Sequence, residues 1–257
     1  MKKSFLIMLS VLLIISAVVY MGCSSKKAAT EPEEATATQV QTATPTATNI
    51  PAVSVTPTVV DDFEDGDVNQ SLLGGSWVVS VDTFGSSMTK TAVNETGQTG
   101  NYCMLIEADV YNGSGSGNWA WTSCAVDVSP NAGPVDFNEL TKNGYTGLRI
   151  KYKGQLGTGS SGVAFLVQLV SNATTDFSKF RYVITAPSSN WVTINIPFKL
   201  NTGGFVRPGW GQAATIDEGE FYSEVRAIEF SISDYTSGQV GFENRGNKWW
   251  IDDITFY

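Results

Sequence analysis

Apolar and polar residues alternate over short stretches from residue 61 to the end of the chain. In residues 148–153 the order Leu-Arg-Ile-Lys-Tyr-Lys places every second side chain on the same side of an extended strand, and residues 228–232 repeat this pattern. Such runs, separated by Gly, Asn, Asp and Ser clusters, predict strands joined by turns. We expect strands at residues 77–81, 103–111, 119–128, 147–153, 163–170, 180–185, 191–200, 225–232 and 249–256. No segment has the pattern of a helix.

The first 23 residues have a different pattern. Two lysines precede an apolar run that ends at Gly22-Cys23, which is the order of an export signal. This segment resembles a bacterial lipoprotein signal, which implies cleavage and a lipid on Cys23. An uncleaved membrane anchor is the alternative, since an apolar run of about 17 residues is at the short limit for a membrane span.

Residues 24–60 are rich in Thr, Ala and Pro and contain no aromatic residue. Such a segment buries too little apolar surface to offset the entropy lost on ordering, so we expect a disordered stalk. Residues 61–257 then form a single folded domain that is held away from a membrane. The expected location is that of an exported lipoprotein, at the cell surface, in an outer membrane or facing the periplasm.

Composition favours strands and turns over long helices. Hydrophobic residues make up 42% of the 257 residues and charged residues 16%, with 25 glycines and 9 prolines. The formal net charge of −9 repels phosphate backbones, so nucleic acid is not an expected partner. The chain has no histidine, which removes the usual general base and every Ser-His-Asp triad. We therefore expect a binding protein, not an enzyme.

Acidic residues occur together with aromatic residues at both ends of the expected domain. Residues 61–67 read DDFEDGD, and residues 249–256 read WWIDDITF. Oxygen ligands suit calcium better than zinc, which would want His or Cys, although the spacing is not that of an EF-hand. Solvated acids at strand ends and turns are the alternative.

Four motifs give a resemblance to a known family: the opening DDFEDGD, WVTINIPF at residues 191–198, Gly209-Trp210-Gly211, and WWIDDITFY at residues 249–257. Together they resemble the galactose-binding-like jelly rolls, in particular the calcium-containing carbohydrate-binding modules of the family eleven type that attach to β-glucans. The chain is similar in the same places to the domain of complex I intermediate-associated proteins. The resemblance implies an all-β jelly-roll β-sandwich of two antiparallel sheets that binds a polysaccharide. It also implies a structural calcium ion near Glu64, Asp67, Asp252 and Asp253.

A pyranose ring has an apolar face and a rim of hydroxyls, so a sugar site needs aromatic and polar side chains together. Trp119 and Trp121 share one side of an expected strand, and Trp210 lies between two glycines in an expected loop. For each candidate, an ordinary role in the core or on a solvated face is the alternative. The candidates are Arg149, Lys151, Tyr152, Gln168, Arg181, Tyr182, Trp119, Trp121 and Trp210.

Two other functions remain open. Glu107 and Asp109 are the best local pair of carboxylates for a glycoside hydrolase. A structural or adhesive lipoprotein could use the same sandwich for protein contacts, because a fold does not fix a function. The sequence does not decide whether Cys103 and Cys124 form a disulfide.

Overall fold

The computed structural model describes residues 58–113, 119–128, 135–234 and 241–257. The expected export signal, the lipid site at Cys23 and nearly all of the expected stalk lie outside these residues. Within the described part of the chain, no helix is long and apolar enough to cross a membrane.

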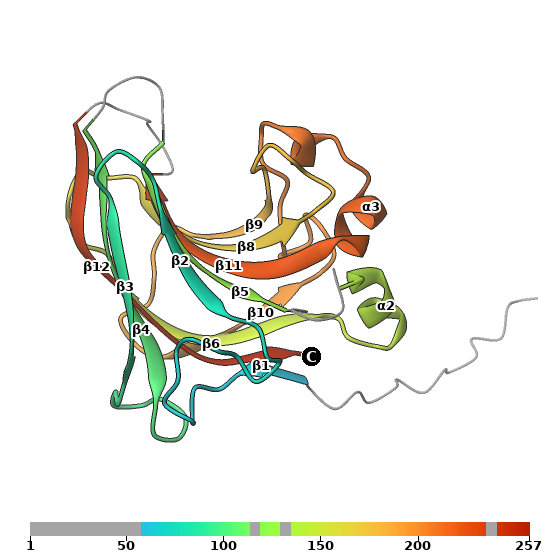
Figure 1. Ribbon diagram of the computed structural model, residues 1–257, viewed down its shortest axis with the longest axis horizontal. Helices are drawn as coiled ribbons and strands as arrows, with labels where there is room; N and C mark the ends of the chain where they lie inside the picture. The colour runs from blue at the N-terminus through green and yellow to red at the C-terminus, as the bar shows by residue number, and fades with distance from the viewer. Residues whose placement is uncertain (1–57, 114–118, 129–134, 235–240) are drawn as a thin grey trace, which may run out of the picture. The chain divides into compact units, whose positions relative to one another are not determined.

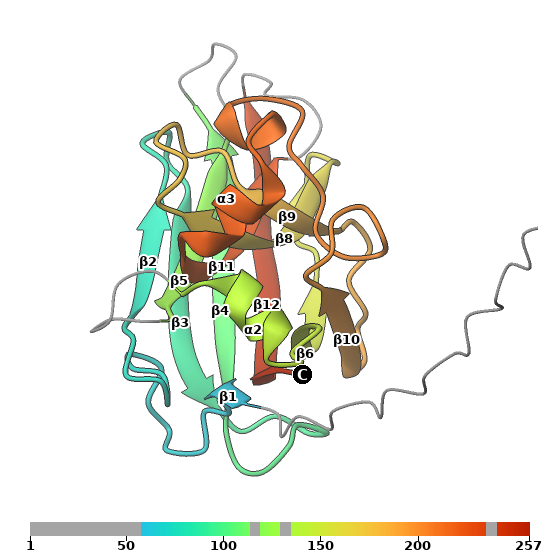
Figure 2. The ribbon, with the colours of Figure 1, turned by 90° about the vertical axis from the view of Figure 1, so that its right-hand side faces the viewer.

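Two antiparallel β-sheets pack face to face (Figures 1 and 2). The first sheet follows the order β10-β6-β12-β4-β3, with β1 and β7 also pairing with β12. Its strands are β10 (Val192–Pro197), β6 (Gly147–Gln155), β12 (Phe242–Phe256), β4 (Cys103–Asn112), β3 (Ser87–Val93), β1 (Thr58–Asp61) and β7 (Thr158–Gly159). The second sheet consists of β2 (Trp77–Val81), β5 (Trp121–Asp127), β11 (Val225–Asp234), β8 (Val163–Ser171) and β9 (Phe180–Ile184), in that order. The expected all-β jelly-roll sandwich is confirmed.

All nine expected strands are present, and most of their ends differ by a few residues at most. β12 begins at Phe242, well before residue 249, and strands β1, β3 and β7 were not expected. The expectation of no helix was wrong, because the structure has short helices α2 (Phe137–Lys142) and α3 (Glu218–Ser223) and a 3-10 turn, η1 (Gln212–Ala214). An aspartate caps each α-helix by accepting hydrogen bonds from backbone N–H groups of the first turn.

Aromatic side chains from both sheets fill the space between them. Trp249 of β12 is fully buried and lies 4.8 Å from Phe165 and 5.3 Å from Phe230, measured between ring centroids. Trp77 continues this layer, 5.8 Å from Phe230 and 5.6 Å from Phe63. Burying rings of this size supplies a large share of the hydrophobic free energy that holds two sheets together.

The second sheet sends alternate residues to opposite faces. In β11, Ile228, Phe230 and Ile232 belong to the core. The residues between them, Glu229 and Ser231, project from the other face because side chains alternate along a strand. The five-stranded sheet is strongly curved, with this outer face on the concave side (Figure 1). Polar side chains therefore lie on this sheet directly behind the hydrophobic core.

The two cysteines of the sandwich are free thiols. Cys124 of β5 lies in the core, whereas Cys103 of β4 is buried outside the core cluster, and its neighbours Met104 and Ile106 belong to the core. Burial raises the pKa of both thiols to about 12. The disulfide that the sequence left open is not formed.

Asp61, the last residue of β1, is a buried carboxylate. It accepts hydrogen bonds from Trp77 Nε1 at 2.6 Å and from the backbone N–H of Phe63 at 3.0 Å. Burial disfavours the charged form and raises the pKa of Asp61 to about 6. The hydrogen bond ties the first strand to the aromatic layer of the core.

We expect Asp61→Asn to remove a pH dependence of folding stability between about pH 4 and pH 6. The folded protein holds the Asp61 proton up to about pH 6, whereas the unfolded chain releases it near pH 3.8. The folded state therefore binds more protons in this window, and wild-type stability falls as pH rises through it. Asparagine still accepts from Trp77 Nε1 but does not titrate.

Urea unfolding of both proteins across this pH range measures the effect. Asp252, whose pKa is also raised to about 6, is present in both proteins, so the difference between the two curves isolates Asp61. Parallel stability curves would contradict the prediction. Asp61→Ala should cost about 1–3 kcal/mol because it leaves the indole N–H of Trp77 buried without an acceptor.

Candidate functional site

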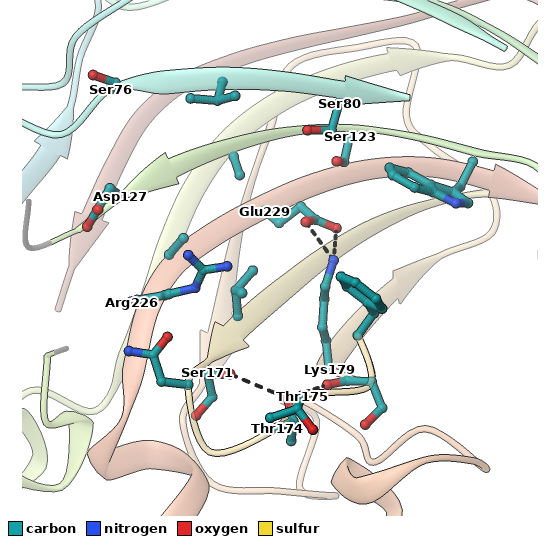
Figure 3. A pocket seen from close by; sticks show the side chains of 18 residues that line it. Ser76, Ser80, Ser123, Asp127, Ser171, Thr174, Thr175, Lys179, Arg226 and Glu229 are labelled. Carbon is teal, nitrogen blue, oxygen red and sulfur yellow. Dashed lines mark hydrogen bonds and ion pairs between the residues drawn. The ribbon is translucent and has the colours of Figure 1, made fainter. Parts of the chain in front are cut away.

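The concave face of the five-stranded sheet holds a cleft of about 640 Å³ (Figure 3). This volume lies in the range of small-molecule binding sites. Strands β2, β5, β11 and β8 form its floor, and the segment between β8 and β9 forms one wall. The lining residues are Ser76, Val78, Ser80, Trp121, Ser123, Ala125, Asp127, Val170, Ser171, Asn172, Thr174, Thr175, Phe177, Ser178, Lys179, Arg226, Ala227 and Glu229.

The cleft combines small hydroxyl side chains with exposed aromatic rings. Ser80 of β2 lies directly opposite Ser123 of β5, and Figure 3 shows their side chains close together above the floor of the cleft. Trp121 is 37% exposed and Phe177 is 84% exposed, although both are large and apolar. Hydroxyls and exposed rings in one concavity can hydrogen-bond and stack on the same ligand.

An ion pair crosses the middle of the cleft. Lys179 Nζ lies 2.7 Å and 2.6 Å from the two carboxylate oxygens of Glu229, as the dashed lines in Figure 3 show. Gln168 Nε2 donates a third hydrogen bond to Glu229 at 3.0 Å. Both charged side chains are largely shielded from water, so the pair is held in a fixed geometry.

Asp82 fixes the backbone of Trp121 at one end of the cleft. Its carboxylate accepts from the N–H of Trp121 at 2.7 Å, and its own N–H donates to the Trp121 carbonyl at 3.2 Å. The same buried carboxylate accepts from the N–H of Phe84 at 2.7 Å and from Ser86 Oγ at 2.7 Å. The turn between β2 and β3 thus positions the exposed tryptophan.

Several sugar-site candidates from the sequence lie on or near this concave face. Trp121 lines the cleft, and Trp119, two residues earlier, is 50% exposed. Gln168 and Arg181 stand opposite each other on β8 and β9, in the same cross-strand row as Glu229. Tyr182, on the other face of β9, packs partly against the core.

The remaining candidates lie elsewhere. Trp210 is in an exposed loop, as expected, but does not line the cleft. Arg149, Lys151 and Tyr152 belong to β6 of the other sheet, so the structure does not bring them to the cleft. Tyr152 is buried in the core, and Arg149 lies 4.9 Å above the Tyr257 ring.

Three important cleft residues were not among the candidates from the sequence: Glu229, Lys179 and Phe177. One signal for Glu229 was available, because it is an acid between two apolar core residues in a strand whose pattern shows that it faces away from the core. Lys179 and Phe177 lie in the turn between two strands, where spacing alone does not indicate which surface they join.

Three of the four candidate calcium ligands contact one loop. Glu64 accepts from the backbone N–H of Asn101 at 2.8 Å. Asp252 accepts from the Thr99 N–H at 2.7 Å, and Asp253 accepts from Thr99 Oγ1 at 2.5 Å. A bulge in the pairing of β12 with β6, where Asp253 has φ 45°, lets both neighbouring aspartates reach the same loop.

The fourth candidate, Asp67, does not contact this loop in the described hydrogen bonds. Its carboxylate accepts hydrogen bonds from the backbone N–H and the side-chain amide of Asn69. Among the residues that the structure describes, no three Asp, Glu, Cys or His side chains gather as a metal site. The oxygen donors near Thr99 still fit calcium chemically. Asp252 is fully buried with Asp253 beside it, and Lys151 Nζ is 3.9 Å away. A calcium ion there would need backbone carbonyl oxygens to complete its ligands.

Comparison with known proteins gives no match to any family model and no match among curated proteins. Solved structures with a similar chain path include the family 11 carbohydrate-binding module from Clostridium thermocellum, in complex with a β-1,3-1,4-mixed-linked tetrasaccharide. It is 18% identical, with a TM-score of 0.48, over 79% of this chain and 96% of that one. A family 30 carbohydrate-binding module is 14% identical, with a TM-score of 0.41, over 79% of this chain and 99% of that one. An exo-β-agarase is 12% identical, with a TM-score of 0.43, over 77% of this chain and 25% of that one.

We expect Lys179→Met to destabilise the fold by about 3 kcal/mol, because it leaves the Glu229 carboxylate in a shielded position without its counter-charge. The double variant Lys179→Met with Glu229→Gln should recover most of this loss, since it removes both charges together. Urea unfolding of the wild type, both single variants and the double variant gives the coupling between the two residues. Additive effects of the two substitutions would show that the pair is not coupled.

Proposed function

We propose that the protein binds a polysaccharide in the cleft of the five-stranded sheet and does not cleave it. The observation that supports this is the combination of exposed Trp121 with serine hydroxyls and the fixed Lys179–Glu229 pair in one concavity. Trp121 offers a flat apolar surface for the CH face of a pyranose ring. The serines and the ion pair offer donors and acceptors for its hydroxyls.

The charges of the cleft favour a neutral ligand. Two carboxylates, Asp127 and Glu229, are matched by two cations, Lys179 and Arg226. The whole chain is acidic, with a formal net charge of −9, and repels anionic polymers at a distance. Among neutral polysaccharides, the sequence resemblance makes β-glucans the first ligands to test.

The carboxylates that suggested a glycoside hydrolase are not in the cleft. Glu107 and Asp109 lie on β4 of the other sheet, where Glu107 pairs with Lys248 at 2.8 Å and Asp109 accepts from the Gly246 N–H at 2.8 Å. Within the cleft, Glu229 is bound by Lys179 and Gln168. This arrangement supports binding without hydrolysis.

We also propose a structural calcium ion at the loop that contains Thr99, which would draw the carboxylates of Glu64, Asp252 and Asp253 together. The ion would neutralise the buried carboxylate of Asp252 and the neighbouring carboxylate of Asp253, and would link the start of the domain to its last strand. The proposed tether to a membrane, through a lipid on Cys23 and the stalk that follows, rests on the sequence of the first 60 residues.

Trp121→Ala should lower affinity for the bound glycan about tenfold or more, because it removes the stacking surface. Binding of the purified protein to insoluble β-glucans, xylan and mannan, followed by calorimetry with soluble oligosaccharides, measures the effect. Asp82→Asn should weaken binding less, since it loosens the backbone of Trp121 without removing the ring.

Leu72→Ala is a suitable control, because Leu72 is exposed and does not line the cleft. Absence of binding to every glycan by folded wild-type protein would refute the proposed function. Release of reducing sugars during the binding assay would refute its non-catalytic part.

Calcium removal should lower the unfolding temperature. A ligand that binds only the folded state adds about 2.7 kcal/mol of stability at a hundred times its dissociation constant. We expect a chelator to destabilise the wild type, and expect Asp252→Asn to remove most of this response. Asp67→Asn should keep it, since Asp67 contacts Asn69 instead of the Thr99 loop. Identical unfolding curves with calcium and with chelator would rule the ion out.

A further inference from the structure

Two exposed aromatic side chains lie on neighbouring loops at the side of the cleft. Phe177, between β8 and β9, is 84% exposed and lines the cleft. Trp210, in the loop before η1, is 54% exposed and lies outside the cleft. We call these two residues and the segments that carry them, 174–178 and 209–213, the loop platform.

Phe177 is held in an unfavourable backbone conformation. Its φ is 63°, in the left-handed region that residues other than glycine rarely adopt. Because the ring is almost fully exposed, burial does not compensate for this conformation. Strained, exposed side chains of this kind persist where the surrounding structure imposes them, and they concentrate at binding sites.

Asp176 joins the two loops and imposes this arrangement. Its carboxylate accepts from the Gln212 N–H at 2.6 Å and from Ser178 Oγ at 2.6 Å. The bond from Ser178 and the bond from Gln212 hold the pKa of Asp176 below its usual value. In return, Gln212 Oε1 accepts from the Thr175 N–H at 2.7 Å. The residues on both sides of Phe177 are therefore fixed to the loop of Trp210.

Gly211 permits this close approach. It has φ 72°, and a Cβ atom at this position would lie 2.6 Å from Asp176 Oδ2 and 2.6 Å from Ser178 Cβ. Any other residue would push the loops apart. The spacing between the segments of Phe177 and Trp210 is thus set before any ligand arrives, which lowers the entropy cost of binding.

We propose that the loop platform is a second contact region for the same polysaccharide, which extends the binding surface from the cleft over Phe177 to Trp210. This inference rests on the proposed function. It implies that the preferred ligand is a long chain whose further sugar units lie on the loops, and not a monosaccharide or a chain end held only in the cleft.

The surroundings of the two rings favour a sugar chain over a protein partner. The two loops that carry the rings are joined by polar groups of Asp176, Thr175 and Gln212. A protein interface usually has a continuous apolar centre, whereas a polysaccharide presents an apolar ring face followed by hydroxyls. Continuity with the cleft through Phe177, which belongs to both, points to a shared ligand.

The test measures affinity against the length of the oligosaccharide. Wild type, Trp121→Ala, Phe177→Ala and Trp210→Ala are titrated with β-glucan oligosaccharides of two to eight units, and with the polymer. Trp210→Ala should bind the shortest ligands that the wild type binds with unchanged affinity, and should bind the longest about five- to tenfold more weakly. Phe177→Ala also changes the lining of the cleft, so it should weaken binding at every length. Trp121→Ala should weaken binding at every length. Leu72→Ala should match the wild type throughout.

The possible outcomes separate this inference from the proposed function. If Trp121→Ala loses affinity while Trp210→Ala matches the wild type at every length, the loop platform is refuted and the cleft stands. If Trp210→Ala loses affinity equally for short and long ligands, its loop acts through the cleft, which also refutes the inference. If folded wild type binds no glycan at all, the proposed function fails, and the loop platform fails with it.

Discussion

The two-residue alternation of the five-stranded sheet is the constraint on which the site depends. Ile228 and Phe230 of β11 have to fill the core against Trp249, so Glu229, which lies between them, has to face outward. The same rule sets Ser123 and Trp121 of β5 on the concave face, because Cys124 lies in the core. A shift of one residue in register would exchange the core and the site.

Much of the fold can be predicted from the sequence, because apolar and polar residues alternate along the strands of a sandwich. β3 was not predicted, since Ser87–Val93 is an edge strand with few apolar residues. The short helices were missed for a different reason. Each is too brief to show a period of 3.6 residues, yet Asp136 and Asp217 are followed three residues later by Glu139 and Glu220, a capping pattern that was readable.

The candidate site was less predictable, because alternation says which side of a strand is polar but not which sheet the strand joins. Arg149 and Lys151 have the same local pattern as the outward residues of β11, but β6 pairs with β12 and β10 in the other sheet. The place of Trp121 in the site was predictable, because it lies on the same side of the expected strand as Trp119. The position of Phe177 depends on a contact between two loops that are far apart in sequence, so no local sequence pattern predicts it.

The buried thiols of Cys103 and Cys124 have a consequence for the conditions in which this fold can exist. The thiolate is the form that reacts in oxidation and disulfide exchange, and a pKa of about 12 leaves almost none of it near neutral pH. Aromatic packing holds the two sheets together without a disulfide between them, so a reductant has no such bond to break. The two buried thiols are also poor targets for oxidants. The sandwich should therefore be indifferent to the redox state of its surroundings.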